Sequence, residues 1–265
     1  MTKLRIVCAA AALAAAASGG ALAETTANIG YMSDYIFRGY YQSESTAFAG
    51  IDIEADSGFY IGAWGADVKD GLEYDLYAGY SGGGENFTWY AGLTGYYYTD
   101  EFDDSYEELN LGFTAGFLTL DYALGDYNIS KTATDWYGNP LPANAEERQT
   151  YQYVGVTVTP EVGPYYFLGR TDYKNLNTGE PTTGRISGTG KHGYWIEIGK
   201  AFEIIPDLEF NIAMLYSGDV PQFPTQSPSS IKLGQGPIDL SEGAENAEYA
   251  LVLTITKTIR MGGNN

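Results

Sequence analysis

The stretch Leu72–Tyr80, with the sequence LEYDLYAGY, alternates strictly between two kinds of side chain. Every second residue from Leu72 to Tyr80 is apolar or aromatic, whereas Glu73 and Asp75 fall on the other face. Successive side chains of a β-strand point to opposite faces of the sheet. A strand that crosses a membrane in a barrel needs this pattern, because one face meets lipid and the other meets water or a polar network. The stretch therefore predicts a membrane-spanning β-strand.

Similar alternating segments of about ten residues recur along the chain. They predict an all-β fold: a transmembrane antiparallel up-and-down β-barrel of about twelve strands. The expected strands are Asn28–Gly39, Ala47–Ala55, Phe59–Asp67, Leu72–Tyr80, Phe87–Tyr98, Tyr106–Phe117, Leu118–Leu124, Thr150–Val158, Tyr165–Tyr173, Tyr194–Phe202, Leu208–Ser217 and Tyr249–Ile259.

The connectors between these segments fall into two sets. Those after every even-numbered strand are short, and those after the first, third and fifth strands are of moderate length. Three connectors are long and rich in Pro, Gly, Asn, Ser and Thr, namely Gly125–Gln149, Lys174–Gly193 and Gly218–Glu248. Outer-membrane barrels have short periplasmic turns and long extracellular loops. The sorting of connector lengths therefore supports that class of barrel.

The first 23 residues are typical of a secretory signal peptide. Lys3 and Arg5 are followed by the apolar run Ile6–Ala17, and Ala21-Leu22-Ala23 is a small-residue cleavage site. We expect residues 1–23 to be removed and residues 24–265 to form the barrel domain. Cleavage would remove Cys8, the only cysteine, so we expect no disulfide or thiol chemistry. The expected location is the bacterial outer membrane, reached through the periplasm.

The charge and the aromatic content limit the possible partners. The formal net charge is −20, and loss of Lys3 and Arg5 would make it two units more negative. Such an excess argues against nucleic acid as a partner and suits cations or a hydrated outer surface. The chain contains 24 Tyr, 11 Phe and 4 Trp, a load that a barrel places at the two membrane interfaces. A soluble β-sandwich or β-barrel with ordinary aromatic packing remains the alternative. The expected partners are outer-membrane lipid and small solutes, and the oligomeric state stays open.

The polar face of the strands predicts the lining of the lumen. The predicted lumen-lining residues are Asp34, Arg38, Asp52, Glu54, Glu73, Asp75, Glu108, Asp121, Arg170, Asp172, Glu197 and Glu209. Ten of them are carboxylates and two are arginines, so a narrow lumen would carry a negative potential that favours cations.

Two points about the lumen stay open at this stage. Arg38 and Arg170 can close the lumen with a salt-bridge network, but two arginines cannot neutralise ten carboxylates, which favours a hydrated lumen over a dry plug. In the third strand, either Phe59-Ile61-Ala63 or Tyr60-Gly62-Trp64 can face the lipid.

The residues needed for catalysis are scarce. His192 is the only histidine, and it lies in a Gly-rich loop rather than in a strand beside an outward serine. A zinc site would need a second His or a Cys, neither of which is available in the barrel region. We therefore expect no enzyme activity, no catalytic residue, no metal and no cofactor.

The N-terminal third carries a family resemblance. The segments Ser33–Gly39, Gly50–Glu54, Ser57–Trp64 and Glu73–Tyr80, together with Gln42-Ser43, make the chain similar to the bacterial TorF-type porins. The resemblance implies an outer-membrane barrel with a transport role, and it carries over no substrate and no catalytic residue. The leading hypothesis is a porin for passive diffusion of small cationic or neutral solutes. The alternative is a non-conducting structural or adhesion barrel that acts through its long loops.

Overall fold

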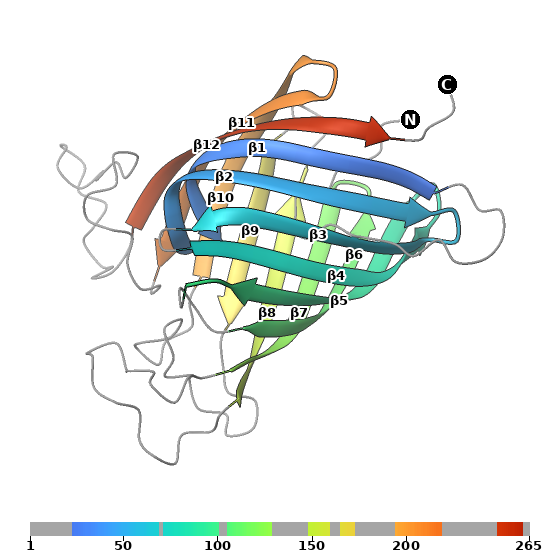
Figure 1. Ribbon diagram of the computed structural model, residues 1–265, viewed down its shortest axis with the longest axis horizontal. Helices are drawn as coiled ribbons and strands as arrows, with labels where there is room; N and C mark the ends of the chain where they lie inside the picture. Colours follow the sequence, from blue (N-terminus) through green and yellow to red (C-terminus); the bar gives the residue numbers. More distant parts are fainter. Residues whose placement is uncertain are drawn as a thin grey trace.

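A computed structural model describes residues 23–68, 71–100, 105–128, 148–159, 165–172, 194–218 and 248–261. Residues 1–22 of the predicted signal peptide, most of the three predicted long loops and His192 lie outside the described residues. The ends of the predicted loop Gly125–Gln149 belong to strands, because the seventh strand runs to Asn128 and the eighth begins at Arg148. Twelve β-strands make up nearly all of the described chain (Figure 1). They are β1 (Ala23–Phe37), β2 (Tyr40–Ala55), β3 (Phe59–Val68), β4 (Gly71–Gly83), β5 (Phe87–Tyr98), β6 (Tyr106–Ala115), β7 (Leu118–Asn128), β8 (Arg148–Val158), β9 (Tyr165–Asp172), β10 (Tyr194–Ile205), β11 (Leu208–Gly218) and β12 (Glu248–Met261).

The strands form a closed antiparallel barrel in which each strand pairs with its neighbours in sequence. The barrel closes where β1 pairs with β12, from Thr25↔Met261 to Met32↔Thr254. Closure removes the unpaired sheet edges that could not be tolerated in lipid. Within the described part of the chain, no helix is long and apolar enough to span a membrane. The predicted fold class and the predicted number of strands are confirmed.

Short turns lie at one end of the barrel. They join β2 to β3, β4 to β5, β6 to β7 and β10 to β11. The β2–β3 turn contains Gly58 with a φ of 84°, and the β6–β7 turn contains Gly116 with a φ of 58°. Both values lie in the left-handed region that glycine adopts without steric penalty. Glycines at these positions therefore favour the short turns that the sequence predicted at this end of the barrel.

At the opposite end, the connector between β1 and β2 differs from the prediction. The sequence predicted that β2 begins at Ala47, after a loop of moderate length, but β2 begins at Tyr40. The turn contains only Arg38 and Gly39, with φ values of 49° and 86°. Two central residues with positive φ are typical of the type I′ turn of a tight hairpin. The polar residues 42–46 look like a loop in the sequence because they lack apolar alternation.

The outward and inward faces of the strands are clear from burial. On β6, buried Tyr106, Glu108 and Gly112 alternate with exposed Leu109 and Leu111. Because large apolar side chains are exposed on the outside, the outer surface suits lipid rather than water. On β3, Gly62, Trp64, Ala66 and Val68 are buried. The outward face of β3 is therefore Phe59-Ile61-Ala63, which resolves the ambiguity in the sequence.

Aromatic pairs on the outer face lie near both ends of the barrel. Phe59 contacts Tyr80 and Phe87 contacts Phe113 near the short turns, with ring centroids 5.2 and 6.0 Å apart. Tyr74 contacts Tyr97 and Tyr216 contacts Tyr249 near the opposite end, at 5.4 and 4.9 Å. Aromatic side chains favour the interfaces of a membrane, where an apolar ring can sit beside a polar phase. Their positions fit the two girdles of a membrane barrel.

The β1–β2 hairpin extends beyond the wall of the barrel. β1 pairs with β12 only up to Met32, and β2 pairs with β3 only from Phe48 onward. Between these points β1 and β2 continue to pair with each other as far as Phe37↔Tyr40. A register shift lies between Tyr35 and Ile36, and Figure 1 shows β1 and β2 curving sharply at this end. Residues Ser33–Ala47, here called the inner hairpin, therefore leave the wall.

Candidate functional site: the lumen

Glu108 and Arg38 form a buried ion pair inside the barrel. Glu108 lies near the start of β6, on the inward face, and its side chain is fully buried. Arg38 lies at the tip of the inner hairpin. Its two terminal nitrogens donate to the two carboxylate oxygens of Glu108, at 2.5 and 3.0 Å. This two-point contact fits the planar guanidinium to the carboxylate and is stronger than a single hydrogen bond.

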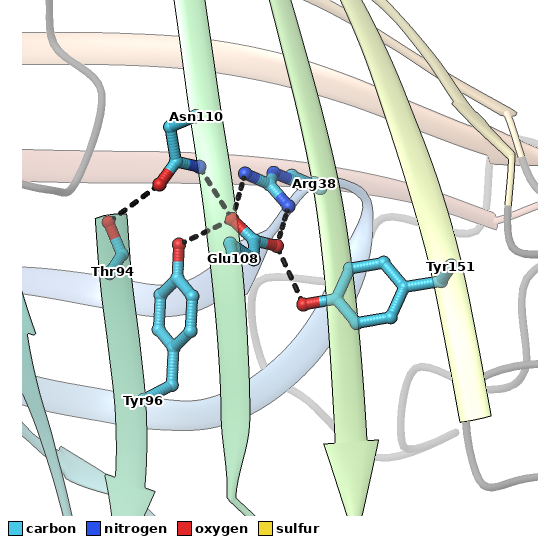
Figure 2. A network of polar contacts seen from close by, with 6 residues as sticks. All are labelled: Arg38, Thr94, Tyr96, Glu108, Asn110 and Tyr151. Carbon is cyan, nitrogen blue, oxygen red and sulfur yellow. Dashed lines mark hydrogen bonds and ion pairs between the residues drawn. The ribbon is translucent and has the colours of Figure 1, made fainter. Parts of the chain in front are cut away.

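Three other side chains donate hydrogen bonds to the Glu108 carboxylate (Figure 2). The Tyr96 hydroxyl lies 3.0 Å from Oε2, Asn110 Nδ2 lies 2.7 Å from Oε2, and the Tyr151 hydroxyl lies 2.7 Å from Oε1. Thr94 in turn donates to Asn110 Oδ1 at 2.7 Å. A buried charge is costly unless it is paired and hydrogen-bonded. The network around Glu108 meets both conditions.

Aromatic rings surround the guanidinium of Arg38. Its Cζ lies 4.1 Å from the centre of the Tyr153 ring and 4.7 Å from the centre of the Phe37 ring. Phe37 itself contacts the ring of Tyr96, with the centroids 5.6 Å apart. An arginine over aromatic faces gains cation–π attraction as well as packing. Arg38 is therefore held in one position by contacts on several sides.

A second group of carboxylates lies on β4. Glu73 and Asp75 are adjacent inward residues, and their exposed fractions are only 2% and 1%. The Tyr35 hydroxyl, from the inner hairpin, donates to Glu73 Oε1 at 3.0 Å. Among the described residues, neither carboxylate oxygen of Asp75 has a hydrogen-bond partner. The inward neighbours of Asp75 on the adjoining strands are Trp64 and Tyr96, which offer it rings rather than charges.

Other predicted residues accept hydrogen bonds from hydroxyl or amide groups on nearby strands. Asp121 on β7 is buried and accepts from the Tyr90 hydroxyl at 2.9 Å. Asp52 on β2 accepts from the Tyr77 hydroxyl at 3.4 Å. Glu54, near the short turns, is exposed and accepts from Ser81 at 3.1 Å. Tyrosine hydroxyls thus serve repeatedly as donors to inward carboxylates, a role that the sequence did not reveal.

The remaining predicted lumen residues are more scattered. Asp34 is buried on the inner hairpin, and Glu197 on β10 and Glu209 on β11 are half-buried. Arg170 and Asp172 lie on β9, where the structure does not describe the side chains. The structure therefore brings Arg38 together with Glu108 and sets Glu73 beside Asp75. The other predicted residues on the wall whose side chains are described, namely Asp52, Glu54, Asp121, Glu197 and Glu209, lie apart.

The lumen is packed at the level of Glu73 and Glu108. Tyr35, Trp64 and Tyr77 form a buried cluster inside the barrel, against which Phe37 and Tyr60 pack. The sequence favoured a hydrated lumen, because two arginines cannot neutralise ten carboxylates. That preference does not hold at this level. The physical reason is that hydroxyl and amide donors, together with Arg38, satisfy buried carboxylates that a count of charges leaves unmatched.

The described residues do not form a metal site. No group of three or more metal-ligating side chains occurs among them. The predicted absence of enzyme activity stays a prediction, because His192 lies outside the part of the chain that the structure describes.

One protein family matches more than half of the chain. Residues 14–180 match the model for Gcw_chp, described as a bacterial protein of unknown function. The chain belongs to the Gcw_chp family. All six residues of the network in Figure 2 lie within the matched region of this family. No curated protein sequence matches the chain significantly.

Structures of membrane proteins are among those similar to this Gcw_chp chain. A chain from a study of the in-meso crystallisation of membrane proteins is 8% identical, with a TM-score of 0.51, covering 91% of this chain and 85% of that one. The outer-membrane protein OprD from Pseudomonas aeruginosa is 13% identical, with a TM-score of 0.38, covering 91% and 66%. Outer-membrane phospholipase A from Escherichia coli is 10% identical, with a TM-score of 0.39, covering 88% and 95%. At 8% identity, the likeness to the first of these chains concerns the fold alone.

Proposed function

We propose that the protein is an outer-membrane channel that passes small cationic or neutral solutes by passive diffusion. The closed transmembrane barrel supplies the frame for such a role. The resemblance of residues 33–80 to TorF-type porins supports the same proposal. The barrel has twelve strands, between the eight that side chains just fill and the sixteen or more that leave a wide aqueous channel. Any passage is therefore narrow.

The charge imbalance of the inner wall is the observation that carries this proposal. Carboxylates from β2, β4, β6, β7, β10 and β11 face inward, and Arg38 is the cation that the structure places among them. A charged passage with low-dielectric walls focuses its potential along the axis. Cations are therefore expected to enter more readily than anions.

The proposed location is the outer membrane, with residues 1–23 removed as a signal peptide and lipid as the partner of the outer face. The exposed leucines and the two aromatic girdles support this placement. Fractionation of producing cells, followed by N-terminal sequencing of the membrane-bound protein, tests both points. The expected result is an outer-membrane protein that starts at Glu24. Recovery in the soluble fraction, or an intact N-terminus, would contradict the proposal.

Planar-bilayer recordings of the refolded protein test the channel. We expect discrete conductance steps and a reversal potential, in a salt gradient, that indicates cation preference. Replacing Asp52, Glu54, Glu73 and Asp75 together by their amides should lower that preference. Glu107→Gln is the matched control, because Glu107 is exposed on the outer face beside Glu108. Absence of conductance, or preference for anions, would refute the proposal.

A non-conducting structural or adhesion barrel is the second candidate. The packing of the lumen around Glu73 and Glu108 favours it. Such a protein would act through the loops between β7 and β8, β9 and β10, and β11 and β12. Absence of conductance, together with partner binding that is lost when these loops are shortened, would decide for this candidate. Enzyme activity is not part of either proposal, and any hydrolase activity that survives His192→Ala would not depend on that histidine as a base.

A further inference from the structure

The inner hairpin crosses the inside of the barrel from one wall to the other. On one side, Ile36 and Tyr41 pack against Leu215 of β11 and Ala250 of β12, which are buried inward residues. On the other side, Arg38 reaches Glu108 of β6. In a closed ring of twelve strands, β6 and β7 lie opposite β1 and β12. The tip therefore spans the lumen rather than lying along its wall.

Contacts along the length of the hairpin hold it in this position. Near its base, Tyr35 packs against Trp64 with ring centroids 5.6 Å apart, and the Tyr35 hydroxyl binds Glu73. Ser43 donates to the backbone carbonyl of Asp67 at 3.1 Å. Contacts on β3, β4, β5, β6, β8, β11 and β12 thus surround the hairpin. The hairpin occupies the space through which a solute would have to pass.

The backbone at Arg38 adopts a conformation that a long side chain disfavours. Its φ of 49° lies in the left-handed region, and the following Gly39 has a φ of 86°. Asn, Asp or Gly is the usual first residue in such a turn, because a longer side chain disfavours this conformation. Arg38 adopts it while its guanidinium binds Glu108 and lies over two rings. An unfavourable backbone conformation that is held by specific side-chain contacts suggests that the Arg38 side chain has a functional role.

We propose that the inner hairpin is the constriction of the lumen and that Arg38 is its specificity-determining residue. This inference rests on the proposed channel function and deepens it. Arg38 supplies a fixed positive charge inside an acidic passage and neutralises Glu108 there. Glu73 and Asp75 then remain as the neighbouring carboxylates that a cation would meet. The constriction passes only small solutes, and its charge selectivity is set by the balance between Arg38 and these carboxylates.

Cross-linking tests the position of the hairpin without requiring conductance. In a Cys8→Ser background, Arg38→Cys combined with Glu108→Cys should be joined by a short bismaleimide in the refolded protein. The matched control combines Arg38→Cys with Leu109→Cys, because Leu109 is the next residue on β6 and is exposed on the outer face. Efficient linkage of position 108 and little linkage of position 109 is expected. Equal linkage, or none at position 108, would overturn the placement of the hairpin inside the lumen.

Bilayer recordings test the selectivity role. Arg38→Ala should raise the unit conductance. It should also raise the cation-to-anion permeability ratio on the order of tenfold at low salt, the effect expected of removing one unit charge near the ion path. Arg38→Lys keeps the charge and is expected to stay close to the wild-type ratio, whereas Glu108→Gln should lower the ratio. An unchanged conductance and ratio in Arg38→Ala would overturn the proposal.

A second variant keeps the proposal testable if Arg38→Ala does not fold. Arg38→Ala leaves the Glu108 charge buried without its cation, so the protein can fail to fold. Arg38→Ala/Glu108→Ala removes both charges and should still show the raised conductance. If the cross-link forms but no variant conducts, the channel function fails together with the selectivity role, while the placement of the hairpin stands. If the protein conducts and the cross-link does not form, the hairpin inference alone fails.

Discussion

Glu108 shows how a charged residue is accommodated inside this barrel. Its carboxylate accepts hydrogen bonds from Arg38, Tyr96, Asn110 and Tyr151, and its side chain is inaccessible to solvent. Asp75 is the contrasting case: it is just as deeply buried, but neither of its oxygens has a hydrogen-bond partner among the described residues. A buried carboxylate is therefore stabilised at position 108 and lowers the stability of the fold at position 75, because its hydrogen-bond partners differ.

Breaking the Arg38–Glu108 pair is expected to be more harmful than replacing it. Glu108→Met leaves the guanidinium of Arg38 buried without its counter-charge and should lower the free energy of unfolding by about 3–5 kcal/mol. Arg38→Met/Glu108→Met removes both charges and should lower it by less than Glu108→Met alone. Urea unfolding in lipid vesicles, followed by fluorescence, measures the difference. Additive losses in the double variant would show that the pair is not coupled.

Asp75→Asn is expected to stabilise the barrel. The change replaces a buried carboxyl group that no donor satisfies, beside the carboxyl group of Glu73, by an amide that can donate a hydrogen bond to Glu73. The gain should be about 1–3 kcal/mol at neutral pH, the usual cost of an unsatisfied buried polar group. Asp52→Asn is the control and should give no gain, since Asp52 accepts a hydrogen bond from Tyr77. A loss of stability in Asp75→Asn, measured by the same unfolding experiment, would contradict this explanation.

At the scale of the elements, a glycine on β6 allows a side chain of β5 to contact β7. A Cβ added at Gly112 of β6 would lie 1.8 Å from Cε1 of Tyr90, the inward residue opposite it on β5. The absence of a side chain at Gly112 lets the Tyr90 ring cross β6 and reach Asp121 on β7. Three neighbouring strands are thus tied together across a glycine. The alternation rule identifies Gly112 as inward, but only the packing shows what fills the space above it.

Gly112→Ala is expected to destabilise the barrel by about 1–3 kcal/mol, because the added methyl group overpacks a filled site. Gly84→Ala is the matched control: Gly84 lies in the β4–β5 turn, and a Cβ there would meet nothing within 4 Å. Urea midpoints of the two variants, compared with the wild type, give the measurement. A Gly112→Ala protein as stable as Gly84→Ala would mean that Tyr90 moves aside without cost.

For the molecule as a whole, the inward carboxylates together should create a negative electrostatic potential that attracts cations along the whole lumen, rather than a single binding site. Salt screens such a field, with a Debye length of about 10 Å at 0.1 M and about 3 Å at 1 M. The proposed cation preference should therefore weaken as the salt concentration rises. Reversal potentials at fixed concentration ratios, recorded from low to high salt, test this expectation. A preference that stays constant over the whole range would indicate a local binding site instead.

The sequence by itself determined the barrel, the number of strands and most of the faces. These features follow from the alternation of polar and apolar side chains within single segments such as Leu72–Tyr80. In that segment the carboxylates face inward and the apolar residues face outward. The polar positions 34, 38, 73, 75 and 108 were singled out by the same rule. Turns such as the one at Gly58 could be placed because their residues favour the required backbone conformation.

Only the tertiary structure decided how the lumen is occupied. Arg38 and Glu108 are 70 residues apart in sequence, and alternation within a strand carries no information on such a pair. Residues 40–46 of the inner hairpin looked like a connecting loop in the sequence, yet the barrel supplies the hairpin with partners on both sides. Whether a charge is paired, hydrogen-bonded or left alone depends on which strands face one another across the barrel. That arrangement exists only once the ring of strands has closed.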